Sequence, residues 1–206
     1  MIKSNYPNFS EKVSIQIGML FSKLPFSPNA WTVFSIVPAV IGFYYLGISK
    51  NLLYGAILFL LAGFIDMIDG GVARVTGRVS NLGAYIDGVA DRIVEAMLFF
   101  GIMFYGVTDF ILPGYVWAAL ALFFGSAMTT FVEVYADHRH AISNPKVFAK
   151  MGGILERLER ITIVFIGMVF GYLVAPVYLT YALAAVSILA IITVLQRIAF
   201  VVKNAD

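Results

Sequence analysis

The stretch DMIDGGVARVTGRVSNLGAYIDGVAD, residues 66–91, places four aspartates at fixed spacings in an otherwise apolar region. Asp66 and Asp69 are three residues apart and Asp87 and Asp91 are four residues apart, so each pair shares one face of a helix. The polar residues near 78–81 predict a turn between the two helices. The resulting hairpin brings Asp69 and Asp87 to one level and places Asp66 and Asp91 one turn deeper.

The composition around this stretch indicates a membrane protein. Of 206 residues, 61% are hydrophobic and only 13% are charged, and the mean hydropathy is +0.90. A soluble domain cannot bury so much apolar surface, so lipid must solvate much of it. The net charge of +2 gives no support for nucleic-acid binding, and the absence of cysteine excludes disulfides. The N-terminus lacks the pattern of a secretory signal, so we expect no removed signal peptide.

Six segments are long and apolar enough to predict transmembrane helices, at residues 29–47, 52–75, 82–106, 113–136, 160–174 and 177–199. Ahead of them, residues 10–23 predict an amphipathic helix lying at the membrane interface. Its apolar face is formed by Val13, Ile17, Leu20 and Phe21. The predicted fold class is all-α: an integral membrane protein with six transmembrane helices after an N-terminal interfacial helix. We expect a single membrane domain, 1–206, with residues 28–206 as the six-helix bundle and 1–27 as the cytoplasmic or interfacial segment.

The basic residues predict the orientation. Lysines and arginines flank one set of helix ends, whereas the opposite loops carry only Lys50. By the positive-inside rule both termini lie in the cytoplasm. The aspartates then lie in the cytoplasmic half of the bilayer, and we expect an active site that faces the cytoplasm from the cell membrane.

The clustered aspartates indicate a divalent metal site. Four carboxylates in one pocket repel one another and stay ionised together only around positive charge. Oxygen ligands suit Mg²⁺, Mn²⁺ or Ca²⁺, and Mg²⁺ commonly completes its shell with substrate phosphates. Small residues beside the aspartates leave room for a ligand, and Arg74 is placed to hold a phosphate. An ion-pair network with Arg74 and Arg92 is a weaker explanation, because two arginines cannot balance four aspartates.

The pattern Asp66-x-x-Asp69-Gly70-x-x-Ala73-Arg74-x8-Gly83-x3-Asp87-x3-Asp91 resembles the signature of the CDP-alcohol phosphotransferases at every specified position. Pro28-Asn29-x-x-Thr32 is similar to the family's N-terminal element. The resemblance implies transfer of a phosphatidyl-type group from a CDP-linked lipid to an alcohol, with release of CMP. It also implies a homodimer and two ions of Mg²⁺ or Mn²⁺.

The resemblance assigns roles to individual residues. Asp66, Asp69 and Asp87 bind the metal that holds the donor's diphosphate. Asp91 helps bind a second metal and acts as the catalytic general base. The CDP-donor contacts are Asn29, Thr32, Asp66, Asp69, Gly70, Ala73, Arg74 and Gly83. Asn29 and Thr32 have an alternative interpretation, because either could simply cap the first transmembrane helix.

The acceptor is left open between two chemistries. Glu156-Arg157-x-x-Arg160 resembles an element of members that use inositol phosphate, the phosphatidylinositol-phosphate and archaetidylinositol-phosphate synthases. Arg157 and Arg160 would grip a phosphate, which favours a phosphorylated polyol such as inositol phosphate or glycerol phosphate. Glu133 is acidic where such relatives are usually basic, so serine or another amino alcohol remains an alternative. The donor lipid can carry diacylglycerol or archaeol.

A divalent-cation transporter is the alternative of another class, because carboxylates in a membrane can also line an ion path. Transporter sites usually lie near the midplane and are formed by broken helices of two repeats. Here all four aspartates lie on one predicted hairpin, and no repeat is visible. The sequence therefore favours the enzyme.

Overall fold

The computed structural model describes residues 7–205, with side chains from Ser14 onward. Within that range the regular elements are helices, and a single isolated bridge joins Phe110 and Leu112. The all-α prediction is therefore confirmed. The chain divides near Gly101 into two compact units, and each unit is described by itself.

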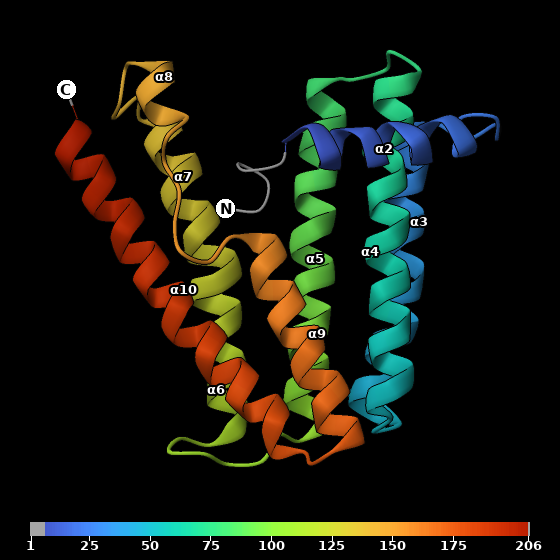
Figure 1. Cartoon of the computed structure of the whole chain (residues 1–206), viewed down its shortest axis with the longest axis vertical. Coiled ribbons are helices and arrows are strands. Elements are labelled where there is room, and N and C mark those ends of the chain that lie inside the picture. Colours follow the sequence, from blue (N-terminus) through green and yellow to red (C-terminus); the bar gives the residue numbers. More distant parts are fainter. Residues whose placement is uncertain (1–6, 206) are drawn as a thin grey trace. The chain divides into compact units, whose positions relative to one another are not determined.

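The first unit is built on a tightly packed helical hairpin. Helix α3 (Pro28–Phe43) continues as the π-helical segment η1 (Tyr44–Ile48) and returns as α4 (Leu52–Val75), as Figure 1 shows. A Cβ atom added to Gly55 would lie 2.9 Å from the Leu46 side chain, and one added to Gly42 would lie 3.2 Å from Phe59. Small residues thus bring the two helices close together, as is common in membrane proteins. Helix α5 (Asn81–Tyr105) follows after a short turn.

Helix α2 (Pro7–Phe21) lies across the C-terminal end of α4 rather than alongside it (Figure 1). Ile17 and Phe21 pack against a buried cluster formed by Trp31, Ile68 and Val72. A helix is therefore present where residues 10–23 were predicted to form one, with bounds Pro7–Phe21, while its position at a membrane interface stays a prediction. Its predicted apolar face is divided, because Ile17 and Phe21 pack on the protein while Leu20 is 67% exposed. The side chain of Val13 lies outside the described residues.

The second unit contains the remaining helices. Helix α6 (Gly114–Leu120), π-helical η2 (Ala121–Met128) and α7 (Thr129–His138) follow one another without a break. After the short helix α8 (Pro145–Phe148), α9 (Arg157–Leu173) and α10 (Val177–Asn204) form a second hairpin. Gly167 in α9 lies directly against Ala182 in α10, so a side chain there would separate the two helices.

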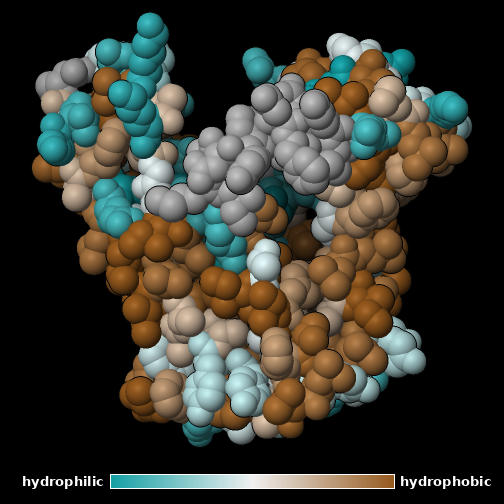
Figure 2. Space-filling view, in the orientation of Figure 1, coloured by the Kyte–Doolittle hydropathy of each residue, from teal (hydrophilic) through white to brown (hydrophobic). Residues whose placement is uncertain are grey.

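Within residues 7–205, four helices are long and apolar enough to cross a membrane: residues 28–48, 52–75, 114–138 and 177–204. They match four of the predicted spans to within a few residues. The other two predicted spans are also helical, as α5 and α9. Helix α5 carries the charged Asp87, Asp91, Arg92 and Glu95 within its apolar sequence, and α9 has only 17 residues. Apolar side chains cover much of the helix surface in Figure 2, and hydrophilic ones gather around α8 and the end of α10.

Candidate metal centre and donor site

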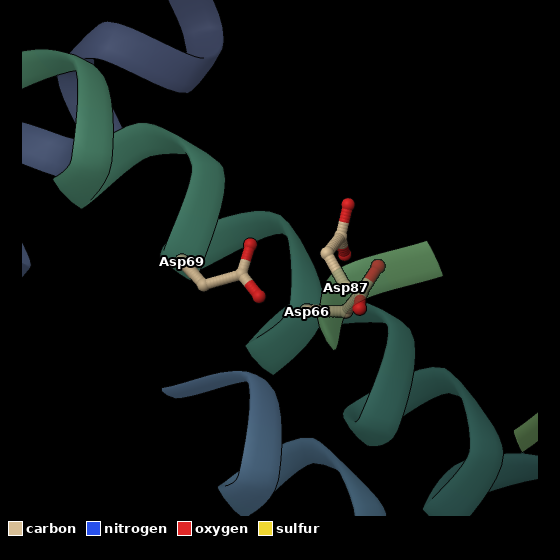
Figure 3. A group of neighbouring side chains, drawn as sticks. All are labelled: Asp66, Asp69 and Asp87. Carbon is tan, nitrogen blue, oxygen red and sulfur yellow. The ribbon is translucent and has the colours of Figure 1, made fainter. Parts of the chain in front are cut away.

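Three of the four signature aspartates meet at one point. Asp66 and Asp69 project from α4 and Asp87 projects from α5, and Figure 3 shows their carboxylates directed toward one another. One oxygen from each lies within 4.8 Å of the others. Two oxygens that bind the same Mg²⁺ ion at about 2.1 Å can be no more than about 4.2 Å apart. The cluster therefore needs only a small adjustment to bind one such ion, and three carboxylates are a suitable ligand set for it.

Asp91 lies one turn further along α5 than Asp87 and is buried. It also engages in interactions with other groups of the protein. Its spacing of four residues keeps it on the helix face of Asp87. This position suits a carboxylate that acts at the same metal centre as Asp87, from one helical turn further along α5.

Thr32 is tied directly to the metal cluster. Its side chain is buried, and its hydroxyl donates a hydrogen bond to the Asp69 carboxylate. Because α3 and α4 pack so closely, this bond orients Asp69 from the neighbouring helix. The capping alternative for Thr32 and Asn29 is wrong, since the residue that caps α3 is Ser27, whose hydroxyl accepts from the Ala30 amide at 3.3 Å.

Asn29 lies beside the start of α5. A Cβ atom added to Gly83 would be 3.3 Å from the Asn29 side-chain oxygen and 3.1 Å from the Ser80 hydroxyl. The same hydroxyl accepts a hydrogen bond from the Gly83 amide at 3.0 Å. A larger residue at Gly83 would therefore displace Asn29, which explains in steric terms why a glycine suits this position.

Arg74 belongs to the last turn of α4. Its guanidinium donates to the hydroxyl of Ser14 on α2. The nitrogen Nη2 lies 3.3 Å from the point where a Cβ atom of Gly70 would be. The arginine thus folds back by one turn, over the glycine that follows Asp69.

The predicted acceptor residues lie in the second unit, where a buried arginine organises part of their surroundings. Arg197 of α10 donates to Glu133 at 2.5 Å, to Glu156 at 3.0 Å and to the Thr129 carbonyl at 2.9 Å. The negative charge of Glu133 is therefore partly compensated within the protein, because the single positive charge of Arg197 is shared with Glu156. This pairing weakens the electrostatic reason for expecting a cationic acceptor.

The two predicted clamp arginines differ in their environments. Arg160 is only 2% exposed and donates to the carbonyl of Gly125. Arg157 begins α9 and is exposed. Helix α9 begins at Arg157, earlier than the predicted residue 160, so both arginines belong to its first turn. Arg157 is thus the more accessible of the two for a soluble anion.

Comparison with known proteins identifies the family. Residues 26–199 match the family model of the CDP-alcohol phosphatidyltransferases, and the chain belongs to that family. It is accordingly a membrane enzyme of the metal-dependent phosphatidyl-transfer class rather than a transporter. The aspartate cluster supplies the carboxylates that could hold the metal.

Relatives and solved structures show similarity over most of the chain. It is 32% identical to an archaetidylinositol phosphate synthase of Pyrococcus horikoshii, covering 89% of this chain and 87% of the relative. It is 30% identical to a phosphatidylinositol phosphate synthase of Corynebacterium glutamicum, covering 91% and 82%. The phosphatidylinositol phosphate synthase of Mycobacterium tuberculosis, crystallised with manganese and citrate, has the same fold, with a TM-score of 0.77, 22% identity and coverage of 93% and 90%. The same enzyme has also been crystallised with CDP-DAG bound.

Some residues around these sites were missed by sequence reasoning. Ser14 contacts Arg74 from 60 positions away, and Arg197 contacts Glu133 from 64 positions away. In the sequence, Arg197 is simply one of the basic residues at the helix ends that predict the orientation. A buried arginine in an apolar helix is itself a functional signal in a membrane protein, so this residue could have been singled out.

Proposed function

We propose that the chain transfers a phosphatidyl-type group, carrying diacylglycerol or archaeol, from a CDP-linked lipid to inositol phosphate and releases CMP. The observation that carries this proposal is the cluster of Asp66, Asp69 and Asp87, whose carboxylate oxygens converge within 4.8 Å. The acceptor is suggested by the relatives named archaetidylinositol and phosphatidylinositol phosphate synthase. Glycerol phosphate is the second acceptor of the same chemistry, and serine is disfavoured because Glu133 is paired with Arg197.

At the donor end, Asp66, Asp69 and Asp87 hold a divalent ion, and Asp91 contributes to a second. When bound, Mg²⁺ or Mn²⁺ would neutralise the donor's diphosphate and the departing CMP. Thr32 orients Asp69, and Arg74 supplies hydrogen bonds to a phosphate. The CDP moiety lies against the small residues Gly70, Ala73 and Gly83, with Asn29 beside Gly83. Small residues allow a ligand to approach the backbone closely.

Asp91 is the proposed general base. A carboxylate can take the proton of the attacking hydroxyl as the new bond to phosphorus forms. The bond between that phosphorus and the CMP oxygen then breaks, and CMP leaves with the electron pair. Burial of Asp91 excludes water, which would otherwise compete with the acceptor hydroxyl.

The acceptor's phosphate is bound by Arg157, with Arg160 in support. A charge-assisted hydrogen bond from a guanidinium to phosphate is among the stronger polar contacts in proteins. The accessible position of Arg157 at the start of α9 favours this role. Arg160, which is buried against Gly125, would act mainly by holding the first turn of α9 in place.

In the membrane, we propose that α5 and α9 cross the bilayer together with the four more apolar helices, giving six spans. Helix α2 then lies at the interface, and both termini face the cytoplasm, because nearly all basic residues flank that side. We further propose a single membrane domain and a homodimer in the cell membrane. Gly167 does not support the dimer, since it is used within the chain against Ala182.

The test is CMP release by the purified protein in detergent. CDP-diacylglycerol and CDP-archaeol are each combined with Mg²⁺ or Mn²⁺ and with inositol phosphate, glycerol phosphate or serine. We expect metal-dependent CMP release with inositol phosphate, and an Asp66→Asn variant as the inactive control. Release with serine alone would reject the proposed acceptor, and release with no combination would reject the function.

A further inference from the structure

Helix α2 and helix α4 touch through their backbones. A Cβ atom on Gly71 would lie 2.5 Å from the Ser14 carbonyl oxygen and 3.0 Å from the Gly18 amide nitrogen. A Cβ atom on Gly18 would in turn collide with the Gly71 carbonyl. Two glycines facing each other therefore fix where α2 crosses α4, because only residues without side chains fit at this point.

This crossing places one polar side chain of α2 against the signature arginine. Ser14 is only 6% exposed, and its hydroxyl accepts a hydrogen bond from Nη2 of Arg74. The same nitrogen lies over Gly70, 3.3 Å from the position of its missing Cβ. The guanidinium is thus held between the glycine next to Asp69 and a hydroxyl from another helix.

Holding an arginine in advance has a physical benefit. A free arginine side chain has about 2 kcal/mol of rotamer entropy to lose when it is immobilised on a ligand. Fixing it beforehand reduces that loss and strengthens binding. A guanidinium has five N–H donors, so a bond to Ser14 leaves most of them for an anion.

We propose that Ser14 is a positioning residue for the CDP-lipid donor and that α2, outside the family signature, thereby forms part of the donor site. This inference rests on the proposed function, because it takes Arg74 to hold a donor phosphate. Ser14 acts through Arg74 and need not touch the lipid itself.

The test compares Ser14→Ala with the wild type, using CDP-diacylglycerol and Mn²⁺. Alanine is the best helix former, so the variant keeps α2 helical. Losing one such hydrogen bond should raise the KM for CDP-diacylglycerol about 3- to 10-fold, with kcat and the acceptor KM nearly unchanged. Ser22→Ala is the matched control, because Ser22 lies just beyond α2 and bonds to the Met19 carbonyl of that same helix.

A double-mutant cycle separates positioning from simple packing of α2. In an Arg74→Ala background, Ser14→Ala should change the donor KM less than twofold, because the residue through which Ser14 acts is gone. An equal effect of Ser14→Ala in both backgrounds would overturn the inference, as would an unchanged donor KM in the single variant.

A binding measurement distinguishes this failure from failure of the proposed function. If the wild type released no CMP with any acceptor, the function would fall. Titration of CDP-diacylglycerol onto the wild type and Ser14→Ala in Mn²⁺ would then decide the inference alone, with weaker binding by the variant supporting it and equal binding rejecting it.

Discussion

Replacing Thr32 by Val should weaken metal binding at the aspartate cluster. The Thr32 hydroxyl donates to Asp69, and both side chains are buried, at 3% and 6% exposure. Water therefore cannot take over the lost hydrogen bond. Valine keeps nearly the same shape, so the change removes a donor without opening a large cavity. The metal-bound state needs Asp69 ionised and correctly oriented, and the hydroxyl favours both.

The size of the effect follows from this one bond. A hydrogen bond to a charged group contributes about 1.5–3 kcal/mol. Each 1.4 kcal/mol corresponds to about a tenfold change in a binding constant. Partners that orient a metal ligand typically change metal affinity by about 10- to 100-fold when removed. We therefore expect the Mn²⁺ concentration for half-maximal activity to rise at least about tenfold in Thr32→Val.

The assay is a Mn²⁺ titration of CMP release at saturating CDP-lipid and acceptor. Thr32→Ser should restore most of the metal affinity, because it returns the hydroxyl. Ser35→Ala is the matched control, since Ser35 is equally buried in α3 but donates to the Thr32 carbonyl at 2.7 Å. An unchanged Mn²⁺ requirement in Thr32→Val, with normal turnover, would refute the role of Thr32 in organising the site.

Three further predictions test other parts of the protein. Asp91→Asn should keep most of the affinity for CDP-lipid but lower turnover by at least about 100-fold, as measured by donor binding beside CMP release; normal turnover would exclude Asp91 as the base. Arg157→Ala should raise the inositol phosphate KM about tenfold and leave the donor KM nearly unchanged; equal changes in both would contradict an acceptor role. Arg197→Met should destabilise the protein by about 2 kcal/mol, because Glu133 and Glu156 lose their partner but remain partly hydrated. Thermal unfolding should therefore show a melting temperature lower by about 4–8 °C. An unchanged melting temperature would contradict a stabilising role for the ion pairs of Arg197.

The helices and the aspartate cluster were predictable because they depend on short sequence intervals. A turn near residues 78–81 and a helical period are enough to bring Asp69 and Asp87 together, and α4 and α5 are indeed separated by residues 76–80. The predicted helix ends differ from the observed ones by a few residues at most places. The largest difference is at the end of α10, which reaches Asn204 where residue 199 was expected. The difference that matters for the site is at α9, where the earlier start includes Arg157 in the helix.

The contacts that refine the sites were not predictable in the same way, because they join residues distant in sequence. The position of Ser14 against Arg74 depends on where α2 crosses α4, and that point is set by two facing glycines. Nothing in the local pattern of either helix specifies it. The N-cap of α3 was also misassigned, because Ser27 and Asn29 are both good caps and only the structure shows that Ser27 accepts the bond.

The acceptor illustrates how a count of charges can mislead. In the sequence, Glu133 opposes Arg157 and Arg160, which leaves an ambiguous balance. In the structure, Glu133 and Glu156 share the buried Arg197, so two carboxylates are engaged by a third arginine. The charge available to a ligand is the charge that remains after such internal pairing, and pairing is a tertiary property. Arg157 at the start of α9 is exposed to solvent, and its guanidinium at this accessible position favours an anionic acceptor over a cationic one.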